Sequence, residues 1–427
     1  MDKGDNPVNG KVERYLASGN RYYYLGAPVQ AATAGIFGDD SELSGSNAYA
    51  RHLYRYTNQW ERITEAHHTF RPLEGFAFKN PFDANRYTFE GTLNTGAVST
   101  KVGNKGWHLL GNPYPSALDW GASESPEGWS GEEHLRTSIW YREGGSGGED
   151  GGGNYATYNR LSGATTNGGQ RYIPPMQSVW VYAESTGELT VDNPARTNQL
   201  VSLYKEETGN TGLRLSFERE GYRDELMVIF NPQSGSHLEP YDTRKRFADA
   251  AYYPQIYTHA PDGTPLAVNA LGPQQREVEI PVGFRTETAG EFTVTAESID
   301  LDANGYEVYL EDRYADAMIP VEKLPYTFSA EVASGTDRFA LHFSQTLTSL
   351  EDLNQAGIKV FSWRDYVQVE LKQASTAQVV IYDVAGKQIH NGRMQSTMEK
   401  YHLRGPGVYV VRVNTGEKVK TQKVVIR

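Results

Sequence analysis

Cysteine is absent from all 427 residues of the sequence. The chain can therefore form no disulfide, use no thiolate in catalysis and build no zinc site from cysteine ligands. No apolar run approaches the ~20 residues that a membrane-spanning helix needs. The opening MDKGDNPVNG also lacks the apolar stretch of a secretory signal. We therefore expect a protein that stays inside the cell, or a fragment whose leader is missing.

Positive charge is scarce as well. The 41 lysines and arginines are outnumbered by 53 aspartates and glutamates, so the formal net charge is −12. An acidic chain repels the phosphate backbones of DNA and RNA. The charge balance therefore predicts that the protein has no nucleic-acid partner.

Tyrosine, glycine and proline are plentiful, with 28, 43 and 20 residues respectively. Tyr, Thr and Val favour strands, whereas Gly and Pro favour tight turns. The composition thus predicts short strands joined by tight turns. The length predicts about two to four domains, at ~150 residues for each domain.

A diverged repeat occupies the first ~200 residues. Four features recur in the same order: a Leu-Gly-x-Pro segment, an aromatic strand, a Pro before an alternating apolar strand, and a Gly-containing turn with a short strand. The paired copies are YYYLGAPVQAATAGIF (22–37) and GWHLLGNPYPSALDW (106–120), LYRYTNQW (53–60) and SIWYRE (138–143), RPLEGFAFKN (71–80) and IPPMQSVWVYA (173–183), and YTFEGTLNTG (87–96) and STGELTVDN (185–193). The repeat predicts an N-terminal region, 1–205, built of two β units at about 11–97 and 98–205.

Evenly spaced strand candidates predict a β-sandwich over 206–345. Within it, YDTRKRFADAA (241–251) is the best helix candidate. The polar stretch that follows predicts a linker at 346–357. A last module, 358–427, has predicted strands near 358–361, 366–372, 377–383 and 388–394, a segment through Leu403, and a terminal hairpin.

The terminal hairpin, GVYVVRVNTGEKVKTQKVVIR (407–427), is unusual because chain ends generally fray. Every second residue from Tyr409 to Val413 is apolar and is predicted to lie on one side of a strand. Asn414 and Gly416 predict the turn into a second strand that runs to Arg427. The pattern predicts a terminal strand that belongs to its sheet.

The last module resembles the C-terminal sorting domain of type IX secretion substrates from Bacteroidota. IKVFSWRDYVQVEL, VVIYDVAGKQI, LRGPGVYVVRV and KVVIR match four successive segments of that domain. The residues that carry the sorting-signal motif are Tyr382, Asp383, Gly386, Gly407, Tyr409, Val424 and Val425. The sequence departs from the family at Ser362, Trp363 and Arg364, where Pro-Asn-Pro is usual.

The resemblance implies an immunoglobulin-like domain, transit through the periplasm, and secretion or display on the cell surface. Its implied partners are the type IX translocon and the outer-membrane shuttle and sortase components. Cleavage and transfer to surface lipopolysaccharide is one implied fate. Judged by the alternating strands alone, the alternative is an ordinary immunoglobulin-like terminal domain without a sorting role.

Upstream segments are also similar to Bacteroidota surface proteins. GKVERYLASGNRYYYLGAPV and GWHLLGNPYPSALDW resemble segments that precede the sorting domain. DELMVIF, DTRKRF and RFALHFS resemble the intermediate module of the same proteins. This likeness implies that the chain is the C-terminal end of something larger.

One segment, IDLDANGYEVYLED, fits the calcium-loop pattern D-x-[DN]-x-[DN]-G-x₅-E through Asp300, Asp302, Asn304 and Glu311. Its flanks alternate with period two and predict strands, not the helices of an EF-hand. Asn304 followed by Gly305 is also a hairpin turn signal. We interpret the segment as a β-hairpin, with calcium binding as the alternative. No metal or cofactor is predicted.

Aromatic residues are dense in the second unit. Exposed aromatic faces bind sugar rings by burying apolar C–H surface. The candidates for sugar stacking are Trp107, Tyr114, Trp120 and Trp140. Aromatic residues on alternating strands also fill sandwich cores, and a core position is the preferred interpretation.

Catalytic motifs are not apparent. His67 and His68 lack the i, i+4 spacing of a helical zinc site, and no nucleophile motif accompanies His134 beside Glu132 and Glu133. We therefore predict no enzymatic activity and no catalytic residue.

Together these features predict an all-β, multidomain protein of β-sandwiches that ends in an immunoglobulin-like domain. The predicted function is structural or adhesive, with a glycan or protein as the adhesion target. The alternative is a carbohydrate-binding accessory region of a larger polysaccharide-degrading surface protein. A hydrolase with an unrecognised site ranks last.

Overall fold

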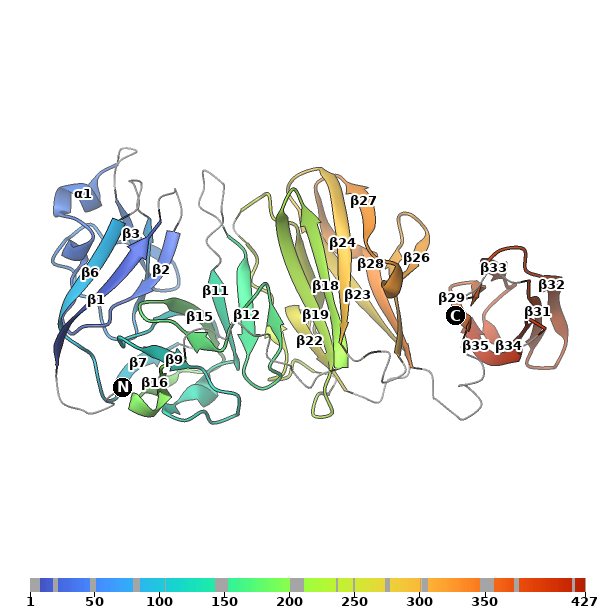
Figure 1. Cartoon of the computed structure of the whole chain (residues 1–427), viewed down its shortest axis with the longest axis horizontal. Helices are drawn as coiled ribbons and strands as arrows, with labels where there is room; N and C mark the ends of the chain where they lie inside the picture. Colours follow the sequence, from blue (N-terminus) through green and yellow to red (C-terminus); the bar gives the residue numbers. More distant parts are fainter. Residues whose placement is uncertain are drawn as a thin grey trace. The chain divides into compact units, whose positions relative to one another are not determined.

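The computed structural model describes residues 8–17, 22–46, 51–79, 85–103, 105–142, 153–199, 211–235, 237–248, 250–272, 277–299, 301, 306–345, 357–371, 376–416 and 419–426. The chain divides into two compact units, Met1–Gln345 and Thr346–Arg427. The all-β fold class is confirmed, since strands dominate both units (Figure 1). The helical elements of the described residues are short: α1 (Asp40–Ser44), η1 (Ala34–Ile36), η2 (Glu132–His134), η3 (Asn193–Ala195) and η5 (Val321–Lys323). The linker expected at 346–357 lies outside the described residues, apart from Gly357.

The first β unit encloses an aromatic core between two sheets. One sheet pairs β1 (Asn9–Leu16) with β6 (Asn85–Thr92). The other has the order β2-β5-β3-β4, formed by β2 (Tyr22–Gly26), β5 (Gly75–Lys79), β3 (His52–Tyr56) and β4 (Trp60–Arg62). Alternation along the strands turns Phe76, Phe78 and Phe89 inward, where they are fully buried around the ring of Phe37.

The second β unit has a sheet of matching strand order. Its larger sheet runs β13-β12-β11-β15-β8, so that β8-β15-β11-β12 corresponds to β2-β5-β3-β4. The strands of this sheet are β8 (Gly106–Gly111), β11 (Ser138–Arg142), β12 (Tyr155–Asn159), β13 (Thr165–Thr166) and β15 (Ser178–Ala183). Two smaller sheets, β10-β16-β7 and β14-β9-β17, consist of β7 (Val98–Val102), β9 (Ala117–Asp119), β10 (Trp129–Ser130), β14 (Tyr172–Ile173), β16 (Gly187–Val191) and β17 (Arg196–Thr197). The repeated sequence segments thus fold into equivalent strands.

The first and second β units meet through a reciprocal contact at their Leu-Gly segments. Gly26 N donates to Met176 O over 3.2 Å, and Gly111 N donates to Leu73 O over 3.0 Å. A Cβ on either glycine would lie 2.7 Å from the Cα of the other, so the approach requires glycine on both sides. Leu73 is buried in the core of the second unit and Met176 in the core of the first. Each unit therefore completes the core of its neighbour.

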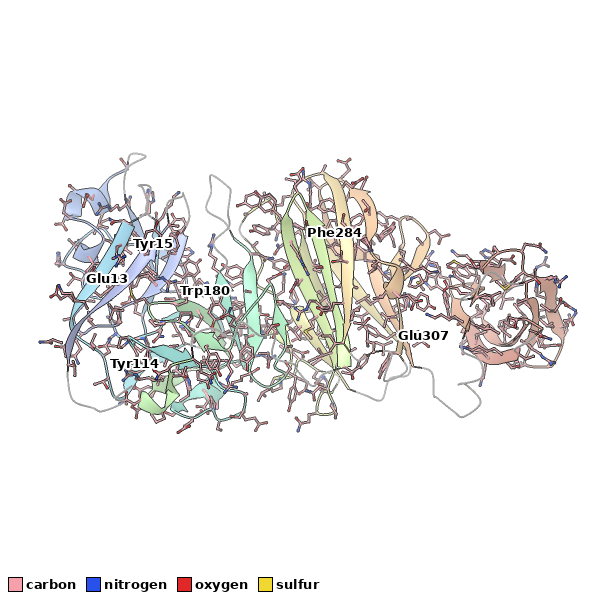
Figure 2. All side chains as sticks on the ribbon, viewed as in Figure 1. Glu13, Tyr15, Tyr114, Trp180, Phe284 and Glu307 are labelled. Atoms are coloured by element: carbon pink, nitrogen blue, oxygen red, sulfur yellow. The ribbon has the colours of Figure 1, made fainter. Side chains whose placement is uncertain are left out.

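Residues 211–345 form one continuous sheet whose two halves face each other across a single core. The strand order is β26-β25-β28-β23-β21-β22-β19-β18-β24-β27, and β20 also pairs with β22. The strands are β18 (Thr211–Arg219), β19 (Tyr222–Phe230), β20 (Thr243–Arg244), β21 (Gln255–His259), β22 (Pro265–Leu271), β23 (Glu277–Thr286), β24 (Gly290–Ile299), β25 (Tyr306–Asp312), β26 (Ala317–Pro320), β27 (Tyr326–Ala330) and β28 (Ala333–Gln345). Phe284 on β23 lies among the strands of this region (Figure 2). The ring of Phe217 on β18 lies 5.5 Å from that of Phe284 and 5.3 Å from that of Phe339 on β28. These rings from opposite halves make the region a sandwich.

The helix predicted at 241–251 is wrong. The segment is extended: β20 pairs with β22, and Lys245 N donates to Pro265 O over 2.8 Å. Lys245 reaches the buried Asp224, whereas Arg244 and Arg246 lie over aromatic rings of the second unit. An extended chain sends successive side chains to opposite sides, and a helix does not. We call residues 239–246 the covering segment, because they lie along β11 through bonds such as Ser138 Oγ to Thr243 Oγ1 at 2.8 Å.

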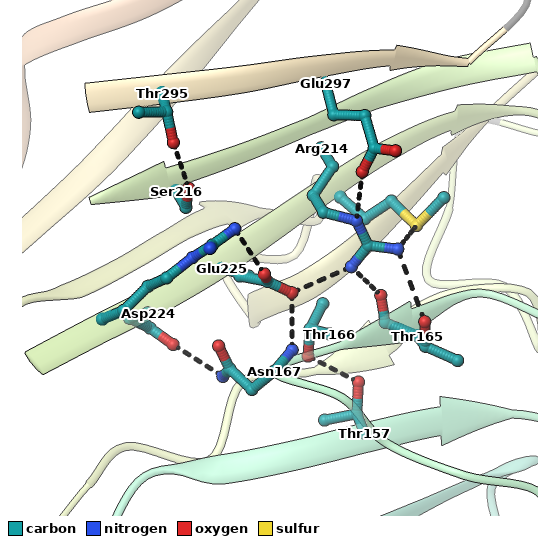
Figure 3. Close-up of polar contacts among 12 residues, drawn as sticks. Thr157, Thr165, Thr166, Asn167, Arg214, Ser216, Asp224, Glu225, Thr295 and Glu297 are labelled. Atoms are coloured by element: carbon teal, nitrogen blue, oxygen red, sulfur yellow. Dashed lines mark hydrogen bonds and ion pairs between the residues drawn. The ribbon is translucent and has the colours of Figure 1, made fainter. Parts of the chain in front are cut away.

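A polar network also joins the sandwich to the second unit (Figure 3). Arg214 on β18 donates to Thr165 O over 2.6 Å and pairs with Glu225 over 2.8 Å. Asn167, which follows β13, donates to Glu225 through its backbone and to Asp224 through its side chain. These side chains belong to strands far apart in the sequence, and they fix the sandwich to the second unit.

The C-terminal unit is a sandwich with the sheets β29-β30-β33 and β32-β31-β34-β35. Its strands are β29 (Ile358–Trp363), β30 (Tyr366–Leu371), β31 (Gln378–Asp383), β32 (Gln388–Arg393), β33 (Met398–His402), β34 (Gly407–Asn414) and β35 (Val419–Ile426). β35 pairs with β34 from Asn414 opposite Val419 to Gly407 opposite Ile426. The prediction that the terminal strand belongs to its sheet is confirmed.

Candidate functional site

The sorting-signal hairpin is shaped by an aspartate and a glycine. Asp383 ends β31, and its Oδ1 accepts from the backbone N–H groups of Ala385 and Lys387, both at 2.9 Å. Gly386 has a φ of 78°, which residues with a Cβ rarely adopt. Tyr382 precedes the aspartate and is half-buried. The D-x-x-G pattern therefore encodes the turn between β31 and β32.

The other motif residues lie on the last two strands. Tyr409 is buried, and its hydroxyl donates to Gly405 O over 3.0 Å, which fixes the approach to β34 much as a tyrosine corner does in other sandwiches. Gly407 is the first residue of β34. On β35, Val424 is 4% exposed and Val425 is 42% exposed. The neighbouring valines thus divide between the core and the surface.

The departure from Pro-Asn-Pro lies in the turn between β29 and β30. Trp363 pairs with Tyr366 across this turn, and their rings are 5.2 Å apart. Arg364 adopts a φ of 47°, and its guanidinium lies 4.7 Å from the Trp363 ring. The tryptophan is buried, so the altered sequence closes one end of the sandwich with an aromatic pair.

Three of the four sugar-stacking candidates are core residues. Tyr114, Trp120 and Trp140 are fully buried, so the sugar-stacking role is wrong for them and the core interpretation is correct. Each polar tip has an internal acceptor: Tyr114 bonds Val191 O, Trp120 bonds Thr137 O and Trp140 bonds Arg244 O. Trp107 is only half-buried, but the guanidinium of Arg246 lies 4.6 Å from its ring. Because the covering segment contacts both Trp140 and Trp107, this sheet face is largely enclosed.

A cluster of partly accessible aromatic rings lies in the first unit. We define the aromatic face by four rings on the outer side of the sheet β2-β5-β3-β4: Tyr22, Tyr54, Tyr56 and Trp60. Trp60 is 39% exposed and the tyrosines are half-buried. Ring centroids are 6.1 Å apart for Tyr22 and Tyr54, and 5.3 Å apart for Tyr56 and Trp60. The face was missed because aromatic density favoured the second unit, although period two placed Tyr54 and Tyr56 on one side.

Trp180 lies where the aromatic face meets the second unit (Figure 2). It is fully buried, and its ring lies 4.6 Å from Tyr56 and 5.7 Å from Trp60. Arg246 of the covering segment lies 3.9 Å from the same ring. Trp180 therefore packs against Tyr56 and Trp60, and Arg246 contacts it from the sandwich region.

Cations surround the aromatic face. Lys79 Nζ lies 5.5 Å from the Tyr22 ring, and Lys79 makes no ion pair with another described residue. The guanidinium of Arg142 lies 5.4 Å from the Tyr24 ring and donates to the Tyr24 hydroxyl over 2.8 Å. Burial, together with the charges of Arg62 and Lys79, lowers the pKa of His52. Arg62 and Lys79 thus place positive charge beside His52.

The calcium-loop segment is only partly described. Asp300, Asp302 and Asn304 lie outside the described residues. The flanking β24 and β25 are strands, as predicted, but the hairpin interpretation is wrong. β24 pairs with β18 and β27, whereas β25 pairs with β26 and β28. The two strands thus lie in different parts of the sheet and do not pair with each other.

Glu311 belongs to a cluster that the sequence did not reveal. Ligand atoms of Glu279, Glu311 and His342 lie within 4.8 Å of one another. Arg313 donates to Glu311 over 3.1 Å and to Glu279 over 2.7 Å, and His342 Nε2 lies 2.7 Å from Glu311. A guanidinium already balances both carboxylates, so the cluster is explained as an ion-pair network.

Among the histidines considered from the sequence, His134 acquires a partner that spacing did not suggest. Its Nδ1 lies 2.8 Å from Ser185 Oγ, and its Nε2 lies 3.9 Å from Glu133. Glu184 and Ser185 also donate backbone bonds to His134 O. The contact joins the η2 turn to the turn after β15, which accounts for it structurally.

Comparisons with known proteins cover both units. Residues 4–343 match a family described as a domain of unknown function, DUF8693, and residues 363–427 match the secretion system C-terminal sorting domain. The second match confirms the resemblance of the last module. No curated protein matches the chain. Over the described residues, no helix is long and apolar enough to span a membrane.

One solved structure with some similarity is PorZ, described as an essential bacterial surface component of the type-IX secretion system of human oral-microbiomic Porphyromonas gingivalis. The identity is 10% and the TM-score is 0.16, over 68% of this chain and 58% of that chain. The chain thus spans less than two thirds of PorZ, and at this TM-score the likeness supports no conclusion about function.

Proposed function

The chain belongs to the DUF8693 family through residues 4–343, and from that premise we propose that it is a non-enzymatic, adhesive protein of the cell surface. Its sorting domain marks it as a type IX secretion substrate, exported to the cell surface or outside. That domain also implies an interaction with the type IX secretion machinery. The proposal concerns the remainder of the chain, which we infer to be cargo that acts by binding.

The observation that carries this proposal is the aromatic face. Adhesion without chemistry needs accessible apolar surface that is held in a fixed geometry. Trp60 supplies exposed aromatic surface, and Trp180 of the second unit packs beneath it. The second unit is in turn fixed to the sandwich by the covering segment. The rings are therefore presented by one compact body.

The polar clusters outside this face have structural explanations, which favours binding over catalysis. Arg313 balances Glu279 and Glu311, and the hydrogen bond between His134 and Ser185 joins two turns. The carbohydrate-binding alternative draws on the same aromatic rings. We take up their ligand below.

Attachment of whole cells tests the adhesive role. The full chain carrying Tyr56→Ala and Trp60→Ala is expressed in a host with type IX secretion, and attachment is measured at equal surface display. We expect attachment to fall several-fold, because two rings of the face are removed. Tyr314→Ala is the matched control, since Tyr314 is 68% exposed on the sandwich. Unchanged attachment of the double variant would contradict the adhesive role.

Removal of residues 358–427 tests the division into cargo and sorting signal. We expect the shortened protein to accumulate in the periplasm, as measured by fractionation and immunoblotting. Normal surface display would overturn that division. Transfer to lipopolysaccharide, which we propose as the means of retention, predicts a larger apparent mass for the surface form than for the purified chain.

A further inference from the structure

The aromatic face presents a row of rings on neighbouring strands. Tyr22 and Tyr54 form one pair at 6.1 Å, and Tyr56 and Trp60 form another at 5.3 Å. Tyr54 and Tyr56 are two residues apart on β3, which places them ~7 Å apart on the same side of the sheet. Aromatic rings bind sugars by burying the apolar C–H surface of the pyranose ring. A row of rings suits an oligosaccharide better than a single sugar.

The charges around these rings are positive. Lys79 and Arg142 lie over tyrosine rings of the same sheet. Arg62 is on β4, two residues after Trp60. Arg62 is fixed by bonds to backbone carbonyls of Leu43 and Gly45, so its charge is not neutralised there by a carboxylate. Salt screens such charges beyond ~8 Å under physiological conditions. They therefore act on a ligand that is already stacked on the rings.

The equivalent sheet face of the second unit shows how such rings are covered within the protein. The planar guanidinium of Arg246 lies 4.6 Å from Trp107, 5.0 Å from Tyr155 and 3.9 Å from Trp180. In the first unit, Tyr56 and Trp60 contact the ring of Trp180 at 4.6 and 5.7 Å, and Trp60 stays 39% exposed. The first unit thus retains an aromatic surface that its counterpart buries.

We propose that the aromatic face binds an acidic oligosaccharide, whose rings stack on Tyr56 and Trp60 and whose carboxylates meet Lys79 and its cationic neighbours. This inference rests on the proposed adhesive function and names its ligand class. The ligand is a soluble uronic-acid polymer, because the cations beside the rings favour an acidic glycan over a neutral one. The net charge of −12 disfavours nucleic acids, which offer bare phosphate charge over long distances.

Calorimetric titration of the purified full chain tests the ligand class. The probes are galacturonate oligomers and uncharged galactose oligomers of equal length. We expect the acidic oligomers to bind at least about tenfold more tightly, and to weaken as salt rises. Equal affinity for the two probes would overturn the role of the cations, and binding of neither would overturn the ligand class.

Variants locate the site. We expect Trp60→Ala to weaken binding by about tenfold through lost stacking, and Trp60→Phe to retain most of it. Lys79→Met is expected to weaken galacturonate binding and to reduce its salt dependence. Tyr314→Ala and Lys101→Met, at exposed positions of the sandwich and the second unit, are the controls. Equal weakening by the controls, or no effect of Trp60→Ala in a folded protein, would overturn the assignment.

The two proposals fail in different ways. If attachment of cells depends on Tyr56 and Trp60 but neither oligomer binds, the ligand class is wrong and adhesion stands. If galacturonate binds at these residues but attachment is unchanged, the ligand class stands and the adhesive role is wrong.

Discussion

Tyr54 in the first unit and Trp140 in the second occupy equivalent places, in the strand that pairs with β5 or with β15. Trp140 is fully buried, and its Nε1 donates to Arg244 O over 2.9 Å. Tyr54 is half-buried, and its neighbour Trp60 is 39% exposed. The two sheets have the same strand order, so strand order does not decide which aromatic residues remain accessible. The covering segment decides it.

Coverage by a distant part of the chain therefore separates the buried face of the second unit from the face that we propose as a binding surface. In the second unit, the covering segment supplies a carbonyl acceptor to Trp140 and a guanidinium to Trp180. The first unit keeps cations at the rim instead. Diverged repeats can use one architecture for two purposes in this way: one copy attaches to the rest of the protein, and the other stays available.

The largest expected effect comes from loosening the covering segment. Lys245 and Asp224 form a buried ion pair, and Asp224 also accepts from Asn154 and from Ile256 N. Lys245→Met leaves a buried carboxylate without its cation, so we expect the free energy of unfolding to fall by about 3–5 kcal/mol. Tryptophan fluorescence during urea unfolding measures this, because six of the seven tryptophans lie before residue 345.

The matched control is Lys79→Met on the aromatic face, where the lysine makes no ion pair with a described residue. Its ammonium group lies over the Tyr22 ring, and loss of that contact is expected to cost less than about 1 kcal/mol. Equal costs for the two substitutions would show that the covering segment is not anchored by Lys245.

The reciprocal contact between the units gives the next largest effect. Leu73→Ala and Met176→Ala each remove a fully enclosed side chain from the core of the other unit. We expect each substitution to lower the free energy of unfolding by about 2–5 kcal/mol, and by similar amounts. Val8→Ala, at a residue that is 58% exposed, is the control. A large loss of stability for only one of the two substitutions would mean that only one side chain stabilises the core of the neighbouring unit.

Much of the fold follows from local patterns. In the last module, the apolar alternation predicted that Val411 and Val413 are buried, and both are fully enclosed. Asp383 and Gly386, identified through the family motif, form a turn by interactions within a few residues. Strands and turns of this kind depend on neighbours in the sequence, and the sequence therefore predicts them well.

The candidate site depended on distant neighbours. Trp140 is capped by a carbonyl 104 residues away, so its aromatic sequence context indicated nothing about exposure. The segment at 241–251 is locally compatible with a helix, but pairing with β22 and the buried Lys245 override that preference. Period two places Tyr54 and Tyr56 on one side of β3, but whether that side is covered depends on distant residues.

The pH dependence of stability comes next in size. Burial raises the pKa of Asp242, in the covering segment, to about 6. Between the ordinary value of 3.8 and about 6, the folded protein holds a proton that the unfolded chain has lost. Stability should therefore fall as pH rises through this range and then level off. The drop is at most about 3 kcal/mol, since each tenfold difference in proton affinity is worth about 1.4 kcal/mol.

Comparison with Asp242→Asn isolates this effect from other carboxylates. The variant loses one acceptor for the backbone N–H groups of Ala270 and Glu239, so it is less stable throughout. Its difference from the wild type should nevertheless shrink as pH rises from 4 to 7, because only the wild type releases a proton there. A constant difference would show that the carboxyl group titrates normally.

The smallest effect tests the comparison of the two units most directly. Trp140→Phe removes the donor to Arg244 O and leaves a buried carbonyl unpaired, which is expected to cost about 1–3 kcal/mol. Tyr54→Phe removes a hydroxyl from a half-buried position where water can replace its partner, and should cost less than about 0.5 kcal/mol. Urea unfolding of both variants gives the difference. If Tyr54→Phe were as costly as Trp140→Phe, the aromatic face of the first unit would be as enclosed as the equivalent face of the second. The aromatic face would then not be a binding surface.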